Sequence, residues 1–130
     1  MAYYLDTSAA VKLVVQEVGS KALRTWLRKT KEPIVSSDLL RTELLRATRR
    51  GAPDQMLQAR LVLDSLVLVG LPSPLFERAG DLEPGLLRSL DALHLAAALD
   101  LGDDLDGLIT YDDRLADAAE AHGILVVAPR

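Results

Sequence analysis

Four acidic residues that are far apart in the sequence lie beside apolar or small-residue segments: Asp6, Glu43, Asp91 and Asp112. An unpaired carboxylate in apolar surroundings is costly, so each of these side chains needs a partner. A group of carboxylates without cysteine or a histidine pair selects a hard cation that prefers oxygen ligands. If the four acids meet in space, they predict a site for Mg²⁺, which Mn²⁺ could also occupy. Such an ion suits the hydrolysis of phosphate esters.

Each acid taken alone also has a simpler interpretation. Glu43 could be a solvated helix residue that pairs with Arg46 or Arg50. Asp91 could be a first-turn acid that gains about 0.3–1 kcal/mol from the helix dipole. The other two acids each follow a predicted strand, where they could do no more than cap the next helix. The metal site is therefore favoured only if all four meet.

The elements that must position these acids follow from the hydrophobic pattern. Short apolar runs typical of strands occur at 2–5, 34–36, 67–69, 107–110 and 124–127. Helical spacing occurs at 10–18, 20–30, 38–50, 54–66, 90–101 and 112–122, and a short helix follows Pro74. The apolar runs are continuous rather than alternating, and we expect 67–69 to be a buried strand. This pattern indicates an α/β fold whose mainly parallel sheet of four to five strands is covered on both faces.

The predicted strands place two of the acids at one edge of the sheet. Asp6 directly follows the first strand, and Asp112 follows the fourth after one intervening residue. In an open parallel sheet, ligands bind beyond the carboxyl ends of the strands. Glu43 and Asp91 lie instead on predicted helices rich in leucine and alanine.

Length and composition limit the class of protein. The 130 residues fit one domain, 1–130. The absence of cysteine excludes disulfides, zinc–thiolate sites and a thiol nucleophile. The first residues lack the features of a signal peptide, and no apolar run approaches the ~20 residues of a membrane span. We therefore expect a cytoplasmic protein with no membrane partner.

Four segments, in order along the chain, resemble the motif blocks of the PIN-domain family, and in particular its VapC toxins. They are YLDTSA at 4–9, SSDLLRTELLRA at 36–47, SLDALHLAAA at 89–98 and TYDDRL at 110–115. Each block alone is a weak signal, but all four in this order are specific, and the resemblance covers almost the whole chain. It implies a PIN-like three-layer α/β/α sandwich.

The resemblance also implies an activity, that of a magnesium-dependent endoribonuclease acting as the toxin of a toxin–antitoxin pair, with tRNA or rRNA as substrate. The residues carried over are the metal ligands Asp6, Asp91 and Asp112, the further catalytic acid Glu43, and the supporting hydroxyls of Thr7, Ser8 and Thr110. The motif register favours Asp112 over its neighbour Asp113. The implied products carry a 5′-phosphate and a 3′-hydroxyl, and the sequence leaves open whether one or two ions act.

Charge is distributed unevenly around a net value of −4. Residues 21–60 contain ten Lys or Arg and four Asp or Glu, whereas 61–130 contain four and thirteen. Candidates for contacts with RNA phosphates are Arg41, Arg46, Arg49 and Arg50. A solvated helix face is the alternative for each of them. His94, one turn after Asp91, either faces the site or is a packed, hydrogen-bonded helix residue.

The family resemblance implies protein partners as well. VapC-like toxins are inhibited by a cognate VapB-like antitoxin, and they form homodimers and toxin–antitoxin hetero-oligomers. The predicted helical hairpin at 38–66 is rich in leucine, and an amphipathic partner helix could use that surface. The alternative is that its two helices pack their leucines against each other.

Two other functions stay open at this point. The first keeps the metal site but makes the protein a phosphatase or a DNA nuclease. A phosphatase with an aspartate nucleophile normally has a second Asp two residues after the first, where this chain has Ser8. The second is a non-catalytic binding module whose acids dock an arginine of a partner. Metal-dependent cleavage of RNA separates these functions from a ribonuclease.

Overall fold

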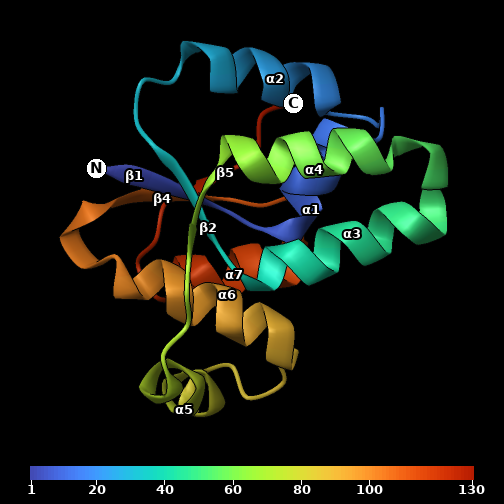
Figure 1. Cartoon of the computed structure of the whole chain (residues 1–130). Coiled ribbons are helices and arrows are strands. Elements are labelled where there is room, and N and C mark those ends of the chain that lie inside the picture. Colours follow the sequence, from blue (N-terminus) through green and yellow to red (C-terminus); the bar gives the residue numbers. More distant parts are fainter.

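The structure is a computed structural model that describes residues 1–130, and its centre is a five-stranded parallel sheet (Figure 1). The strands are β1 (Ala2–Leu5), β2 (Ile34–Ser37), β3 (Val67–Val69), β4 (Leu105–Ile109) and β5 (Val126–Val127). Their order in the sheet is β3-β2-β1-β4-β5, and every neighbouring pair is parallel. The prediction of an α/β fold with a mainly parallel sheet is therefore confirmed.

Helices cover both faces of this sheet, which gives the expected three layers (Figure 1). One face carries α1 (Thr7–Val14), α2 (Ser20–Lys29), α3 (Leu39–Gly51) and α4 (Met56–Ser65). The other face carries α5 (Ser73–Asp81), α6 (Ser89–Asp100) and α7 (Asp113–Ala121). None of these helices has both the length and the apolar character that crossing a membrane requires.

Successive residues of the central strands enter different cores. In β1, Tyr4 packs with α5–α7, whereas Leu5 packs with α1–α4. Strand β4 repeats the arrangement with Leu108 and Ile109. All four side chains are fully buried. Because neighbouring side chains of a strand point to opposite faces, the continuous apolar runs of the sequence are what a sheet covered on both sides requires.

The order of the strands reverses at β1. The chain runs from β1 to β2 and β3 on one side, and then returns to place β4 on the other side of β1. The carboxyl ends of β1 and β4 are adjacent, because Leu5 pairs with Ile109. The Asp6 N–H donates a hydrogen bond to the Ile109 carbonyl oxygen at 3.2 Å. Such a reversal is the place where open parallel sheets bind their ligands.

Some predicted element boundaries are wrong. The first helix ends at Val14, and Val18 is 92% exposed in the turn before Gly19. That glycine adopts a left-handed φ of 92°, so the chain turns where the apolar spacing alone would have continued the helix. Strand β3 is an edge strand with Val67 53% exposed, not a buried strand. A short apolar run does not distinguish an edge strand from a central one.

Candidate active site

A cavity of about 370 Å³ lies where β1 and β4 end, and all four predicted acids line it. The lining residues are Asp6, Thr7, Ser8, Glu43, Arg88, Ser89, Leu90, Asp91, His94 and Asp112. The start of α1, the middle of α3, the first turn of α6 and the start of α7 each contribute one acid. The structure therefore brings together side chains that the sequence keeps far apart.

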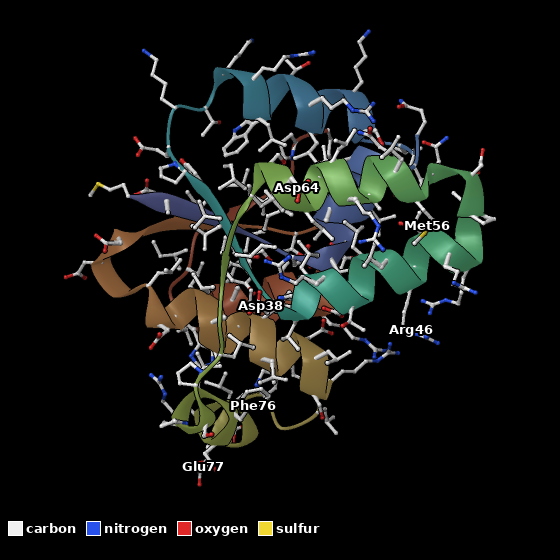
Figure 2. The ribbon with its side chains drawn as sticks, viewed as in Figure 1. Asp38, Arg46, Met56, Asp64, Phe76 and Glu77 are labelled. Carbon is white, nitrogen blue, oxygen red and sulfur yellow. The ribbon has the colours of Figure 1, made fainter.

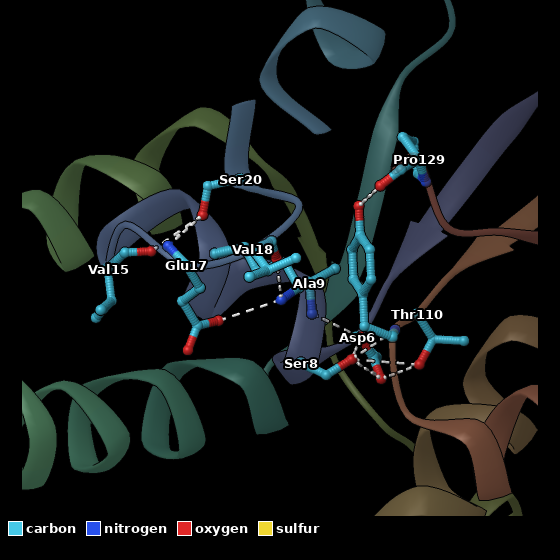
Figure 3. A network of polar contacts seen from close by, with 11 residues as sticks. Asp6, Ser8, Ala9, Val15, Glu17, Val18, Ser20, Thr110 and Pro129 are labelled. Carbon is cyan, nitrogen blue, oxygen red and sulfur yellow. Dashed lines mark hydrogen bonds and ion pairs between the residues drawn. The ribbon is translucent and has the colours of Figure 1, made fainter. Parts of the chain in front are cut away.

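Asp6 is the most buried of the four acids, with 3% of its surface exposed. Its carboxylate accepts hydrogen bonds from the hydroxyls of Thr110 at 2.6 Å and Ser8 at 2.7 Å (Figure 3). It also accepts one from the Ala9 N–H at 3.0 Å, so Asp6 is the N-cap of α1. Asp6 therefore caps α1, as the simpler interpretation predicted, and also lines the cavity.

The electrostatic position of Asp6 is unfavourable without a cation. Burial raises the pKa of the Asp6 carboxyl, and hydrogen bonds from Thr110, Ala9 and Ser8 offset only part of that effect. A carboxylate held by three donors is fixed in orientation even though its charge is poorly solvated. A divalent cation in the cavity would supply the missing stabilisation.

Asp112 lines the cavity, whereas its neighbour Asp113 does not. The Asp112 Oδ1 atom accepts hydrogen bonds from the N–H groups of Arg114 at 2.9 Å and Leu115 at 3.1 Å. Asp112 is therefore the N-cap of α7, which fixes its carboxylate at the rim of the cavity. Asp113 is exposed on the first turn of that helix. The geometry favours Asp112 as the fourth acid, as the motif register does.

Asp91 is partly buried and has no ion-pair partner in the chain. Burial raises the pKa of the Asp91 carboxyl, and the nearby charge of Asp112 raises it further. The charges of Asp6 and Glu43 act in the same direction, and only His94 opposes them. The carboxylate is thus placed as a cation ligand would be.

The hydrogen-bond partners of Glu43 come from other helices and not from its own helix α3. Its Oε1 atom accepts a hydrogen bond from the Thr7 hydroxyl at 2.8 Å and lies 2.6 Å from Nε2 of His94. The alternative pairing with Arg46 or Arg50 is therefore wrong. Burial acts to raise the pKa of Glu43, but the hydrogen bond and charge of His94 and the bond from Thr7 outweigh it and hold this pKa below its usual value.

His94 connects Glu43 to the centre of the sheet. It is 1% exposed, and its Nδ1 atom lies 2.7 Å from the hydroxyl oxygen of Tyr4. The Tyr4 hydroxyl donates to Ser37 Oγ at 3.0 Å. Burial raises the pKa of Tyr4, so this phenol stays protonated. His94 is thus a packed, hydrogen-bonded helix residue, and through Nε2 it also positions Glu43.

The donors around the cavity fit a magnesium ion. They are carboxylate and hydroxyl oxygens, without cysteine, and the only imidazole is committed to Glu43 and Tyr4. No three acidic or histidine side chains stand close enough to form a closed metal cage. Magnesium keeps several of its waters and uses one or two carboxylates, so it requires no such cage.

The arginines predicted to contact RNA lie outside the cavity. Arg41 forms an ion pair with Asp38 at 2.8 Å, and both side chains are half exposed. The other three, Arg46, Arg49 and Arg50, are exposed on α3, and Arg46 projects from the helix in Figure 2. The structure thus leaves them free to bind phosphate at the surface but does not bring them to the acids.

Sequence reasoning missed two polar residues in the cavity wall, Arg88 and Ser89. Arg88 is the N-cap residue of α6, and Ser89 begins its first turn, which also carries Asp91. Their nearness to a predicted ligand at the start of a helix was the signal that could have found them. Arg88 is the one cation among the lining residues, and it offers a guanidinium for a substrate phosphate.

The repulsion around Asp91 predicts a pH effect in the metal-free protein. Because folding raises the pKa of Asp91, ionisation of this carboxyl lowers the free energy of unfolding. This destabilisation is absent below the ordinary pKa of 3.8, grows as the pH rises from there through the raised pKa, and is complete above it. We expect Asp91→Asn in EDTA to gain stability over the wild type as the pH rises from about 4 to about 7. Urea unfolding measures this difference. Asp113→Asn is the control, and a difference independent of pH would contradict the assignment.

Comparison with known proteins agrees with this arrangement. The family model of the PIN domain matches residues 3–121. Ribonuclease VapC46 of Mycobacterium tuberculosis is 48% identical over 128 residues, which cover 98% of each chain. The crystal structure of VapC20 from the same species, described as a toxin that cleaves the sarcin–ricin loop, matches with a TM-score of 0.78 at 14% identity, over 98% of this chain and 99% of its own.

A second solved structure has the same fold. It is a toxin–antitoxin complex from Klebsiella pneumoniae, in which one chain matches with a TM-score of 0.74 at 22% identity over 98% of both chains. The match to the family model and the identity to VapC46 each extend over nearly the whole sequence. The chain therefore belongs to the PIN-domain family, and within it to the VapC ribonucleases.

Proposed function

We propose that this protein is a magnesium-dependent endoribonuclease and that it acts as the toxin of a toxin–antitoxin pair. The observation that carries the proposal is the meeting of four acids around one cavity at the reversal of strand order. The relationship to ribonuclease VapC46 favours RNA over DNA or a phosphate monoester as the substrate. The acids and the relationship together favour a catalytic protein over a binding module.

Asp6, Asp91 and Asp112 are the residues that would hold Mg²⁺, one or two of them directly and the others through water molecules of the ion. Asp6 is fixed by its three hydrogen bonds and Asp112 by its two, so both ligands are oriented before an ion arrives. When bound, the ion would stabilise charge on the phosphate and lower the pKa of a water molecule. Arg88 would hold a phosphate oxygen of the substrate at the same cavity.

Glu43 is the residue that would orient the attacking water. Both of its hydrogen bonds, from Thr7 and His94, go to the Oε1 atom, so the Oε2 atom is free to accept a hydrogen bond from that water. Its lowered pKa keeps the carboxylate ionised at neutral pH. Thr7 and His94 would thus position Glu43, and Glu43 would position the water.

A cognate antitoxin and a second copy of the chain are the proposed protein partners. The hairpin of α3 and α4 buries Leu40, Leu44 and Leu63, as intramolecular packing predicts. It also leaves Leu57 72% and Leu61 54% exposed, one turn apart on α4. These two exposed leucines form an apolar strip that nothing in the chain covers. The strip also supports the other interpretation, in which a partner helix covers part of the hairpin.

The proposal is tested by cleavage of single-stranded RNA with Mg²⁺ and with EDTA. We expect cleavage only with the ion, products with 5′-phosphate ends, and no cleavage of DNA of the same sequence. Asp112→Asn should lower the rate by about a hundredfold or more, because asparagine keeps the cap of α7 but loses the charge. Its matched control is Asp113→Asn, which should cleave like the wild type. Equal loss in both variants, or cleavage in EDTA, would refute the proposal.

A further inference from the structure

A second cavity adjoins the candidate active site. It has a volume of about 490 Å³ and is lined by Asp38, Leu39, Thr42, Glu43, Leu71, Phe76 and Leu90. Glu43 and Leu90 line both cavities, so the two spaces adjoin at these residues. We call this second space, between the start of α3 and helix α5, the α3–α5 groove. A chain of nucleotides that reaches the acids can therefore continue into the groove.

One wall of the groove is an exposed aromatic ring. Phe76 on α5 is the only phenylalanine of the chain, and 48% of its surface is exposed (Figure 2). Other aromatic side chains are committed to the interior: Tyr3 packs edge-to-face with Trp26 at 4.8 Å, and Tyr4 is buried. An unpaired base stacks readily on such a ring, with about 1–3 kcal/mol per base.

The groove also has uncommitted hydrogen-bond acceptors. Asp38 occupies the N-cap position of α3, but its side chain makes no capping hydrogen bond. Its Oδ1 atom accepts from Arg41 Nε at 2.8 Å and Oδ2 makes no hydrogen bond within the chain, so Oδ2 and the second lone pair of Oδ1 can both accept. A carboxylate oxygen recognises ring and amino N–H groups, and guanine offers two of them side by side on its Watson–Crick edge.

We propose that the α3–α5 groove binds an unpaired guanine next to the cleaved phosphodiester bond. The base stacks on Phe76 and donates its N1–H and amino hydrogens to Asp38. Arg41 at the groove and Arg88 at the first cavity supply cations for the flanking phosphates. This inference rests on the proposed ribonuclease function and adds a base preference to it.

Cleavage of randomised single-stranded RNA, followed by sequencing of the product ends, tests the proposal. In the wild type, guanine should be enriched about tenfold at one fixed position beside the cut. Asp38→Asn should abolish this enrichment while cleavage continues. Phe76→Ala should lower kcat/KM by about ten- to a hundredfold, the factor of one lost stack, and Phe76→Tyr should restore it. Leu86→Ala is the matched control, because Leu86 is 96% exposed and lines neither cavity.

The outcomes separate the groove from the ribonuclease itself. A wild type that cleaves no RNA would overturn the proposed function and this inference with it. Cleavage without any base preference beside the cut, or a guanine preference that survives Asp38→Asn, would overturn the inference alone. So would a Phe76→Ala variant that cleaves normally but changes its state of self-association, because the groove would then be a protein-docking surface. Thermal unfolding of each variant shows that the chain is folded.

Discussion

Replacing Asp6 by asparagine should reduce RNA cleavage by about a thousandfold and raise the melting temperature of the metal-free protein. Asparagine has nearly the shape of aspartate, and its carbonyl oxygen can still accept from the Ala9 N–H, so the cap of α1 is kept. The buried negative charge disappears, and with it the penalty that raises the pKa of Asp6. Loss of activity together with gain of stability identifies a residue retained for its charge.

Metal dependence provides the control for this variant. In the wild type, Mg²⁺ at a hundred times its Kd should stabilise the folded state by about 2.7 kcal/mol. In Asp6→Asn the same concentration should produce little or no rise in melting temperature. Differential scanning calorimetry with and without the ion measures both effects. A variant that unfolds at lower temperature, or that Mg²⁺ stabilises as strongly as the wild type, would show that Asp6 is chiefly structural.

His94→Ala should have the second large effect, a loss of about 3 kcal/mol in the free energy of unfolding. The substitution leaves a cavity where a fully buried ring contacted Tyr4, and it removes the hydrogen bonds to Tyr4 and Glu43. Cleavage should fall about ten- to a hundredfold, because Glu43 keeps only the bond from Thr7. Urea unfolding and single-turnover cleavage measure the two losses.

Glu43→Gln is the matched variant, since glutamine can still accept from Thr7 and His94 through its carbonyl oxygen. It should keep most of the stability but lose cleavage, which separates the positioning role of His94 from the direct role of Glu43. If His94→Ala is as stable as the wild type, the chain of contacts from Glu43 to Tyr4 does not support the fold. If Glu43→Gln cleaves normally, Glu43 does not orient the water.

The sequence was sufficient for the fold and for the meeting of the acids because both depend on order along the chain. Apolar runs placed Asp6 and Asp112 after strands, and parallel strands bring their carboxyl ends to one edge. The four motif blocks then supplied Glu43 and Asp91, whose helical context alone was ambiguous. The hydrophobic pattern predicted this meeting of the acids even though it did not give every helix and strand boundary correctly.

What the sequence could not provide were contacts between side chains from different elements. The partners of Glu43 come from α1 and α6, so no pattern on α3 predicts them in preference to Arg46 or Arg50 of the same helix. The same holds for Arg88, whose place in the cavity depends on how α6 meets the sheet. Exposure is equally non-local, because Val67 and Phe76 are apolar by type and are exposed only because nothing packs over them.

The position of β4 next to β1 has a consequence for the synthesis of the protein. Asp6 leaves the ribosome long before Asp112 does, yet the two acids follow neighbouring strands. A nascent chain therefore cannot assemble its carboxylates until β4 and Asp112 have been made. With the proposed activity, a nascent chain would cleave no RNA until β4 inserts beside β1, a delay that the topology imposes without any inhibitor.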